Sequence, residues 1–196
     1  MGKNNRLDTL TLEDLDKEIL DEEKKDESSN GNFASNNTQV NRSASGSFQV
    51  LNIIGYVSNA NNPIMFTEML WYGKKCYDLR HWNHNMGKPL KGLTFSKTEL
   101  LDIRKLGYIE DVSNDVFEEI GRYQIKNQKA VIHKVMMTYS RFTSKGKVFH
   151  KGIYLVNWGQ GARIDIRGWA DDYSACTKGI TLSLEEYNKF INLISI

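Results

Sequence analysis

Residues 164–169 read IDIRGW, and this stretch decides the fold because a close copy of it, YDLRHW, stands at residues 77–82. Around it, residues 158–187 overlay residues 71–100 without a gap, and nine of the thirty positions are identical. Tryptophan, a scarce residue type, coincides twice in this overlay. Self-similarity at a fixed spacing indicates a repeated structural unit. The chain is therefore predicted to be a tandem duplication of one small module.

Alternation within residues 164–169 indicates a strand. Ile164 and Ile166 would share the core face, and Arg167 and Trp169 would lie on the opposite face. Hairpins are expected around residues 59–63 and 144–146. Residues 183–186 read SLEE and residues 96–99 read SKTE, and both have the form of a capping box that starts a helix. Each module is thus predicted to be β-β-β-β-α.

The predicted fold class is α+β, with the two modules forming a pseudo-dimer within one chain. Four segments are expected: an acidic, largely disordered tail over 1–46, a first module over 47–107, a connector over 108–130 and a second module over 131–196. Charge divides in the same place. Residues 1–46 carry ten acids and six bases, and residues 47–196 carry fourteen acids and twenty bases. Residues 28–46 are polar and poor in apolar side chains, as in a flexible tether.

Several function classes are excluded by composition and spacing. No run approaches the ~20 apolar residues of a membrane span, and the acidic first 30 residues do not resemble a secretory signal. Cys76 and Cys176 are far apart and fit two incidental thiols in a reducing compartment. No catalytic set recurs between the copies, and the histidines have no counterparts in the repeat. We therefore expect a cytoplasmic protein that is not an enzyme and uses no metal or cofactor.

Residues 157–159, 164–169 and 177–183, together with residues 78–82 and 91–95, resemble the positive-cofactor-four family of transcriptional coactivators. The match is closest to its small bacterial, single-strand-binding branch and covers roughly residues 47–107 and 131–196. The resemblance implies a Whirly-like fold, pairing of modules through their helices, and curved sheets that bind single-stranded DNA without strong sequence preference. It would make a bacterial member nucleoid-associated. Family members have one module per chain, whereas this chain has two.

Carried over position by position, the resemblance assigns nucleic-acid contacts to both copies. They are Trp71, Arg80, Trp82, Lys91 and Gly92 in the first, and Trp158, Arg167, Trp169, Lys178 and Gly179 in the second. The first hairpin of the second copy adds the basic residues Lys134, Arg141, Lys145, Lys147, His150 and Lys151, which the first copy lacks. Equal binding by the two copies is therefore not expected.

The residues support the same chemistry without the family name. Single strands are held by cations along the phosphates and by aromatic rings on which bases stack. Trp82 and Trp169 each follow an arginine expected to point outward, which favours contact with a strand over core packing. Trp71 and Trp158 end apolar strands, so packing and stacking are equally expected. Asp78 and Asp165 fit partners that orient arginine better than catalytic acids.

The function predicted is non-enzymatic binding of single-stranded DNA in replication, recombination, repair or transcription. The leading alternative is an RNA-binding or RNA-chaperone protein, because backbone and stacking contacts discriminate poorly between the two nucleic acids. A third reading is a transcription-regulatory protein whose acidic tail recruits a protein partner. A monomeric pseudo-dimer is expected, with a homodimer as the alternative. Which pathway the protein serves does not follow from the sequence.

Overall fold

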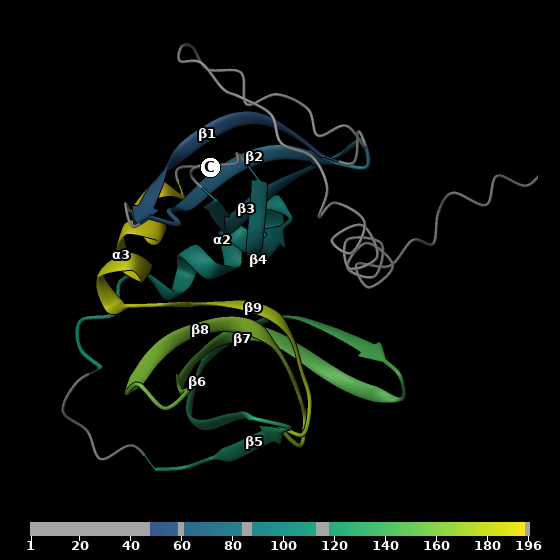
Figure 1. Ribbon diagram of the computed structural model, residues 1–196, viewed down its shortest axis with the longest axis vertical. Helices are drawn as coiled ribbons and strands as arrows, with labels where there is room; N and C mark the ends of the chain where they lie inside the picture. The colour runs from purple at the N-terminus through teal and green to yellow at the C-terminus, as the bar shows by residue number, and fades with distance from the viewer. Residues whose placement is uncertain (1–47, 59–60, 84–87, 113–117, 195–196) are drawn as a thin grey trace, which may run out of the picture. The chain divides into compact units, whose positions relative to one another are not determined.

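The computed structural model describes residues 48–58, 61–83, 88–112 and 118–194, which lie in one compact unit, Gln39–Ile196. The predictions for residues 1–46 fall outside these ranges. Nine strands and two helices are present in the described ranges (Figure 1). The first group is β1 (Phe48–Ser58), β2 (Ile64–Trp71), β3 (Lys74–Asn83), β4 (Lys88–Phe95) and α2 (Lys97–Leu106). The second is β5 (Gly121–Ile125), β6 (Gln128–Ser144), β7 (Lys147–Asn157), β8 (Ala162–Ala170), β9 (Cys176–Leu182) and α3 (Leu184–Leu193).

The fold is mixed, as predicted, with two antiparallel sheets and two helices. The strands follow chain order in both sheets, as β1-β2-β3-β4 and β5-β6-β7-β8-β9. We call the first sheet with α2 the first module, and the second sheet with α3 the second module. Residues 131–196 hold the four strands β6 to β9 and the helix α3, as predicted, but the second sheet has a fifth strand that was not predicted. This strand, β5, lies inside the stretch 108–130 that was expected to be only a connector, and it buries Tyr123 against the second sheet.

The two modules repeat one another in detail. Helices α2 and α3 begin and end at matching positions of the repeat, and a complete capping box starts each one, at Ser96 with Glu99 and at Ser183 with Glu186. The long strands β1 and β6, which correspond to one another in the repeat, each carry three irregularities in register. Those of β1 lie between Val50 and Ser58, and those of β6 lie between Ile132 and Ser140. Such β-bulges bend a strand and increase its twist, so both sheets curve strongly.

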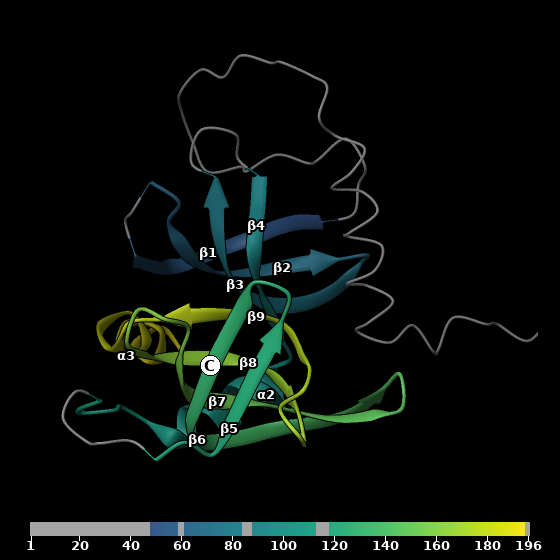
Figure 2. The ribbon, with the colours of Figure 1, turned by 60° about the horizontal axis from the view of Figure 1, so that its bottom comes forward.

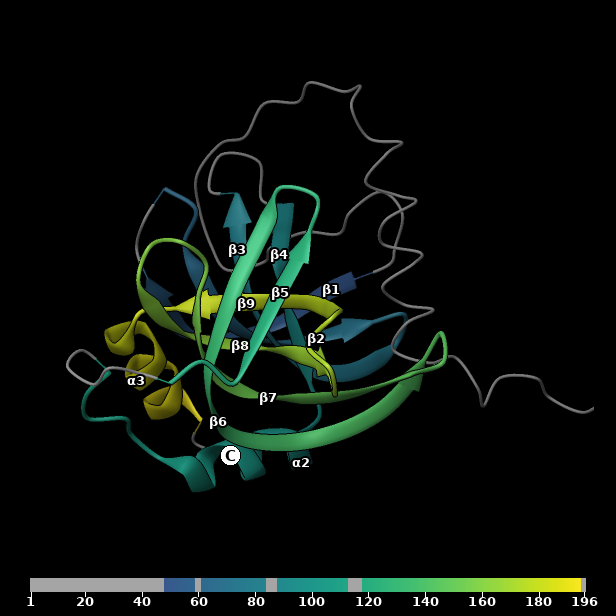
Figure 3. The same ribbon diagram turned by 90° about the horizontal axis from the view of Figure 1, so that it is seen from below.

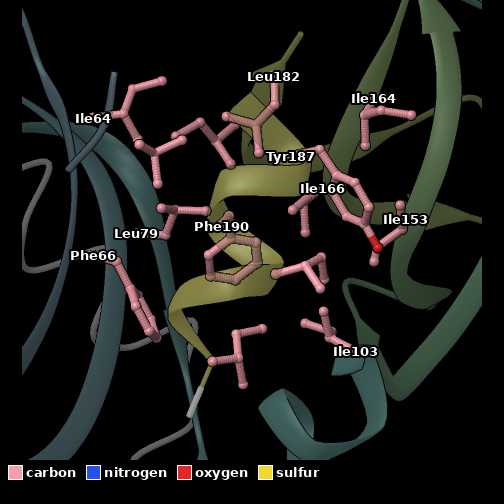
Figure 4. Packing of buried hydrophobic residues seen from close by; sticks show 14 of the residues in the cluster. Ile64, Phe66, Leu79, Ile103, Ile153, Ile164, Ile166, Leu182, Tyr187 and Phe190 are labelled. Atoms are coloured by element: carbon pink, nitrogen blue, oxygen red, sulfur yellow. The ribbon is translucent and has the colours of Figure 1, made fainter. Parts of the chain in front are cut away.

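One hydrophobic core joins the modules. It contains Phe66 and Leu79 from the first sheet, Ile153 and Ile166 from the second, and apolar residues of both helices. Helix α3 contacts β1 of the first module, and α2 contacts β6 of the second, so each helix also packs on the other module's sheet. Figure 4 shows α3 between the two sheets, with Phe190 beside Phe66 and Leu79.

The stretch after α2 is tied to α3 by hydrogen bonds. The backbone N–H of Ile109 donates to Asn188 Oδ1 at 3.1 Å, and Asn188 Nδ2 donates to the carbonyl of Ile109 at 2.9 Å. The hydroxyl of Tyr187 donates to the carbonyl of Gly107 at 3.1 Å. These contacts and the shared core make the two modules one cooperative body. The two modules are thus joined within a single chain, each helix packing on the sheet of the other module.

Candidate nucleic-acid interface

The repeated Asp-x-Arg motif forms the same buried ion pair in both modules. In the first, Arg80 Nε and Nη2 donate to the two carboxylate oxygens of Asp78 at 2.5 and 2.7 Å. In the second, Arg167 Nη2 donates to Asp165 Oδ1 at 2.8 Å, and its Nε donates to Oδ2. Residues two apart share a strand face, which allows this side-on geometry. The prediction that the two aspartates orient arginine is confirmed.

Each of these arginines also lies against a tryptophan. The guanidinium carbon of Arg80 is 4.9 Å from the ring centre of Trp71, and that of Arg167 is 4.5 Å from the ring centre of Trp158. Arg80 is 6% exposed and Arg167 is 4% exposed. Burial raises the pKa of the Asp78 carboxyl, and the charge of Arg80 opposes that shift. The predicted outward placement of the two arginines is wrong, because both guanidinium groups are held inside by a carboxylate.

The predicted outward placement of Trp82 and Trp169 is wrong as well. They are 2% and 1% exposed. The predicted alternation is correct, since Trp169 lies on the face opposite the main core, but a second apolar cluster covers that face. Within the described ranges, the indole Nε1 of each of these two tryptophans has no hydrogen-bond partner. These rings therefore contribute to the structure as apolar groups.

Strand β5 explains the burial in the second module. Tyr123 lies edge-on to Trp158 and Trp169, with ring centres 5.9 and 5.4 Å away. Figure 2 shows β5 and β6 crossing over β8 and β9, which brings this tyrosine onto the tryptophans. In the first module Phe48 at the start of β1 takes the corresponding place, 5.4 Å from Trp71 and 6.2 Å from Trp82. The curvature produced by the β-bulges thus closes each concave face.

Trp71, which ends β2, and Trp158, which directly follows β7, differ in exposure. Trp71 is 6% exposed and belongs to the interior, whereas Trp158 is half-buried. Trp158 lines a shallow pocket of about 260 Å³ together with Gln160, Gly161, Arg163 and Thr181. Of the four tryptophans, Trp158 is therefore the one that is partly exposed, and it is the one that lines this pocket. Arg163 was missed by the sequence reasoning, although strand alternation from Asp165 and Arg167 places it on the same face.

Gly92 and Gly179 leave room for arginine. They pair with Arg80 and Arg167 on the neighbouring strands. A Cβ atom at Gly92 would lie 2.0 Å from the Cβ of Arg80, and one at Gly179 would lie 2.4 Å from the Cβ of Arg167. On the face where a Cβ would lie, the space beside these glycines is therefore taken by arginine, and their assignment to nucleic-acid contacts stays a prediction. The space is filled by the buried ion pairs.

The lysines and the remaining arginine of the prediction divide into two groups. Exposed residues are Lys91, Lys134, Arg141, Lys145 and Lys147, and Lys178 is half-buried. Lys151 is only 12% exposed in its side chain and lies 3.6 Å from Glu99 Oε1 on α2, so it links the two modules instead of facing solvent. Lys91 is exposed as a whole residue, but partial burial of its amino group, followed by the nearby charge of Arg167, lowers its pKa. Lys91 of the first module is therefore close to the ion pair of the second.

The strands as a group are strongly basic. The nine strands contain fourteen lysines and arginines and three acids. Two of those acids, Asp78 and Asp165, are buried in the ion pairs, and the third, Glu68, lies 2.7 Å from Lys75 Nζ. The other acids of the described residues lie in helices, turns and connections. The exposed surface of the sheets therefore attracts polyanions.

The described residues form neither a metal site nor a disulfide. No three His, Cys, Asp or Glu side chains within the described ranges are grouped so that they could hold a metal ion. Cys76 and Cys176 are free thiols. None of the described helices is long and apolar enough to cross a membrane. No protein-family model matches this chain, and no curated protein matches it either.

Proposed function

We propose that this protein binds single-stranded DNA without strong sequence preference, through the exposed cations of its two sheets. The observation that carries the proposal is the distribution of charge. The charged residues of the strands are almost all lysines and arginines, and the three acids among them are paired. Most of the affinity of such a surface comes from phosphates and from the release of their counterions. The repeated Asp-x-Arg motif and the resemblance to the positive-cofactor-four family support the same function and a Whirly-like description of the modules.

The structure changes the expected mode of contact. Trp71, Trp82 and Trp169 are buried, so stacking on all four tryptophans is not available in this conformation. Lys91 at the junction of the modules, Arg163 beside the Trp158 pocket and Lys134 of β6 remain to contact phosphates. Trp158 is left to stack with a base, which is worth ~1–3 kcal/mol in single-strand complexes. In this proposal, contacts with phosphates dominate, and the single-stranded DNA is bound whatever its base sequence.

The proposal places the protein wherever melted strands must be held, in replication, recombination, repair or transcription. Binding requires no chemistry on the nucleic acid, so no catalytic group is assigned. The acidic segment 1–46 enters as a competitor or as a docking segment for a protein partner. RNA is an outcome of the test, because phosphates and base faces are common to both polymers.

The test uses labelled oligo-dT and oligo-U in fluorescence anisotropy titrations with the full chain. A variant with Lys91→Gln and Arg163→Gln removes two strand cations. Its matched control, Lys97→Gln with Arg104→Gln, removes the same charge from exposed positions of α2. We expect the strand variant to bind oligo-dT more weakly and its log–log salt slope to fall by ~0.7 for each lost contact. The control should keep the affinity and slope of the original chain.

Two results would count against the proposal. Equal losses in the strand variant and the helix control would mean that only net charge matters. Absence of saturable binding to oligo-dT at low salt would remove the function itself. Tighter binding to oligo-U than to oligo-dT would assign the protein to RNA.

A further inference from the structure

The hairpin of β6 and β7 is longer than its counterpart in the first module. The three β-bulges align β1 with β6, and by that alignment Ser58 corresponds to Ser140. In the first module the paired strands stop at Ser58 and Ile64. In the second module they continue from Ser140 and Lys151 through four more pairs, to Ser144 and Lys147. Residues 141–150 thus extend the hairpin of the second module, where the first module has only residues 59–63, and they are here called the finger.

The base of the finger belongs to the sheet, because Phe149 and His150 pair with Ala170 and Trp169 of β8. The pairs Thr143–Val148 and Ser144–Lys147 extend beyond β8 as a two-stranded ribbon. Phe142 and Phe149 pair across the finger with ring centres 5.3 Å apart and ring planes 10° from parallel. The turn is tight, with Lys145 and Gly146 at φ of 47° and 75°, as in the two-residue turns that match strand twist. Asp171 Oδ1 lies 2.5 Å from His150 Nε2, and Asp172 Oδ2 lies 3.6 Å from Lys147 Nζ. The loop after β8 therefore braces the finger on one side.

The finger carries cations and no acid. Arg141, Lys145 and Lys147 are exposed. Within the described residues neither Arg141 nor Lys145 has an ion-pair partner. The two phenylalanine rings stack on each other, and the Phe142 ring also lies near Gly168. Because the rings are occupied and the exposed groups of the finger are cations, phosphates are the groups that the finger would bind. Figure 3 shows the β6–β7 turn projecting beyond the neighbouring strands.

We propose that the finger enters the major groove of duplex DNA, so that the preferred ligand is a junction between single-stranded and double-stranded DNA. This inference rests on the proposed function, which supplies the single-stranded arm. The major groove of B-form DNA is ~12 Å wide and ~8.5 Å deep and admits a two-stranded β-ribbon. The two residue pairs beyond β8, at ~3.3 Å each, give the tip of the finger a free reach of about 7 Å, which is most of the depth of that groove. Arg141, Lys145 and Lys147 would then meet the phosphates that border the groove.

The same geometry separates DNA from RNA. The major groove of A-form RNA is deep and too narrow for side chains to read. A duplex RNA arm should therefore add nothing that the finger can use. An ordinary cationic surface would respond to both duplexes alike, since both carry phosphates. This difference distinguishes insertion into a groove from general attraction.

The experiment measures the affinity of the full chain for four labelled ligands at low salt. They are oligo-dT, the same oligo-dT ending in a DNA duplex, the same oligo-dT ending in an RNA duplex, and the blunt DNA duplex alone. We expect the DNA junction to bind about tenfold more tightly than oligo-dT, the scale of two or three added phosphate contacts. The RNA junction should bind like oligo-dT. The blunt DNA duplex should bind more weakly than oligo-dT.

A finger variant with Arg141→Gln, Lys145→Gln and Lys147→Gln should lose the gain from the DNA duplex and keep its affinity for oligo-dT. The matched control, Lys97→Gln, Arg104→Gln and Lys189→Gln, removes three exposed helical cations and should keep the gain. Circular dichroism spectra that match those of the original chain would show that both variants are folded.

The possible failures are distinct. Equal affinity of the original chain for oligo-dT and for the DNA junction would overturn the inference, as would an equal gain from the RNA duplex. A finger variant that loses oligo-dT binding would show that the finger contacts the single strand, which also overturns it. Failure of the original chain to bind oligo-dT would instead refute the proposed function. In that case the blunt DNA duplex, compared between the original chain and the finger variant, still tests insertion into the groove.

Discussion

Replacing Trp169 by alanine should destabilise the protein strongly. Trp169 is 1% exposed and lies against four rings, those of Tyr123, Tyr154, Trp158 and Tyr173, with ring centres 5.4 to 6.5 Å away. Its indole is the centre of the second apolar cluster, so its removal leaves a cavity that the surrounding strands cannot fill without moving. A buried Trp→Ala substitution typically costs ~3–5 kcal/mol. The free energy of unfolding of a whole domain is only ~5–15 kcal/mol.

The assay is urea unfolding followed by far-ultraviolet circular dichroism, since fluorescence would be altered by the lost tryptophan. For a chain of this size, that loss corresponds to a fall in Tm of roughly 6–20 °C. Leu51→Ala is the control, because Leu51 is 43% exposed and its truncation should change the free energy of unfolding by no more than about 0.5 kcal/mol. A Trp169→Ala protein as stable as the Leu51→Ala protein would refute the reasoning. The ring would then lie outward, as the sequence alone had suggested.

Four further predictions concern other parts of the chain. Gly179→Ala and Gly92→Ala should each lower the free energy of unfolding by ~1–3 kcal/mol, because the added Cβ meets an arginine Cβ at 2.4 or 2.0 Å; an unchanged urea midpoint would contradict this. Burial raises the pKa of the Cys76 thiol to about 12, so this thiol stays protonated at pH 8 and should react with a maleimide more slowly than free cysteine does. Reaction as fast as that of free cysteine would show an accessible thiolate. Removing residues 1–46 should strengthen binding to oligo-dT at low salt and less so at physiological salt, because a tethered polyanion competes with phosphate and is screened over ~8 Å; identical curves for both chains would exclude competition. Light scattering should give the mass of one chain, since both helices are buried in a core that the two modules of that chain share, and an obligate dimer at low concentration would contradict that arrangement.

Much of the fold follows from local pattern. Two capping boxes and the alternation of isoleucines predicted the helix starts and the core face of β8, and the structure confirms both. These features depend on neighbouring residues, so a single sequence contains them. The repeat then predicted two similar modules, and α2 and α3 occupy matching positions in it.

The burial of the candidate site could not be predicted in the same way. Alternation correctly placed Trp169 opposite the main core, but it does not say what covers the second face of a sheet. That depends on the bulges that curve β6 and on Tyr123, which is 46 positions away in the chain and lies in a polar stretch. The ion pair of Arg167 with Asp165 was foreseen as a contact and not as a reason for burial. A buried arginine requires a partner, and the repeated aspartate two positions earlier was the signal.

The central claim is that the basic sheets hold single-stranded DNA, and one titration tests it most directly. Labelled oligo-dT is titrated with the full chain over a series of salt concentrations, with a blunt DNA duplex measured alongside. The account predicts saturable binding that is tighter for oligo-dT than for the duplex, with a log–log salt slope of about −0.7 for each phosphate contacted. Binding that does not saturate at low salt, or that is equally tight for the duplex, would contradict it.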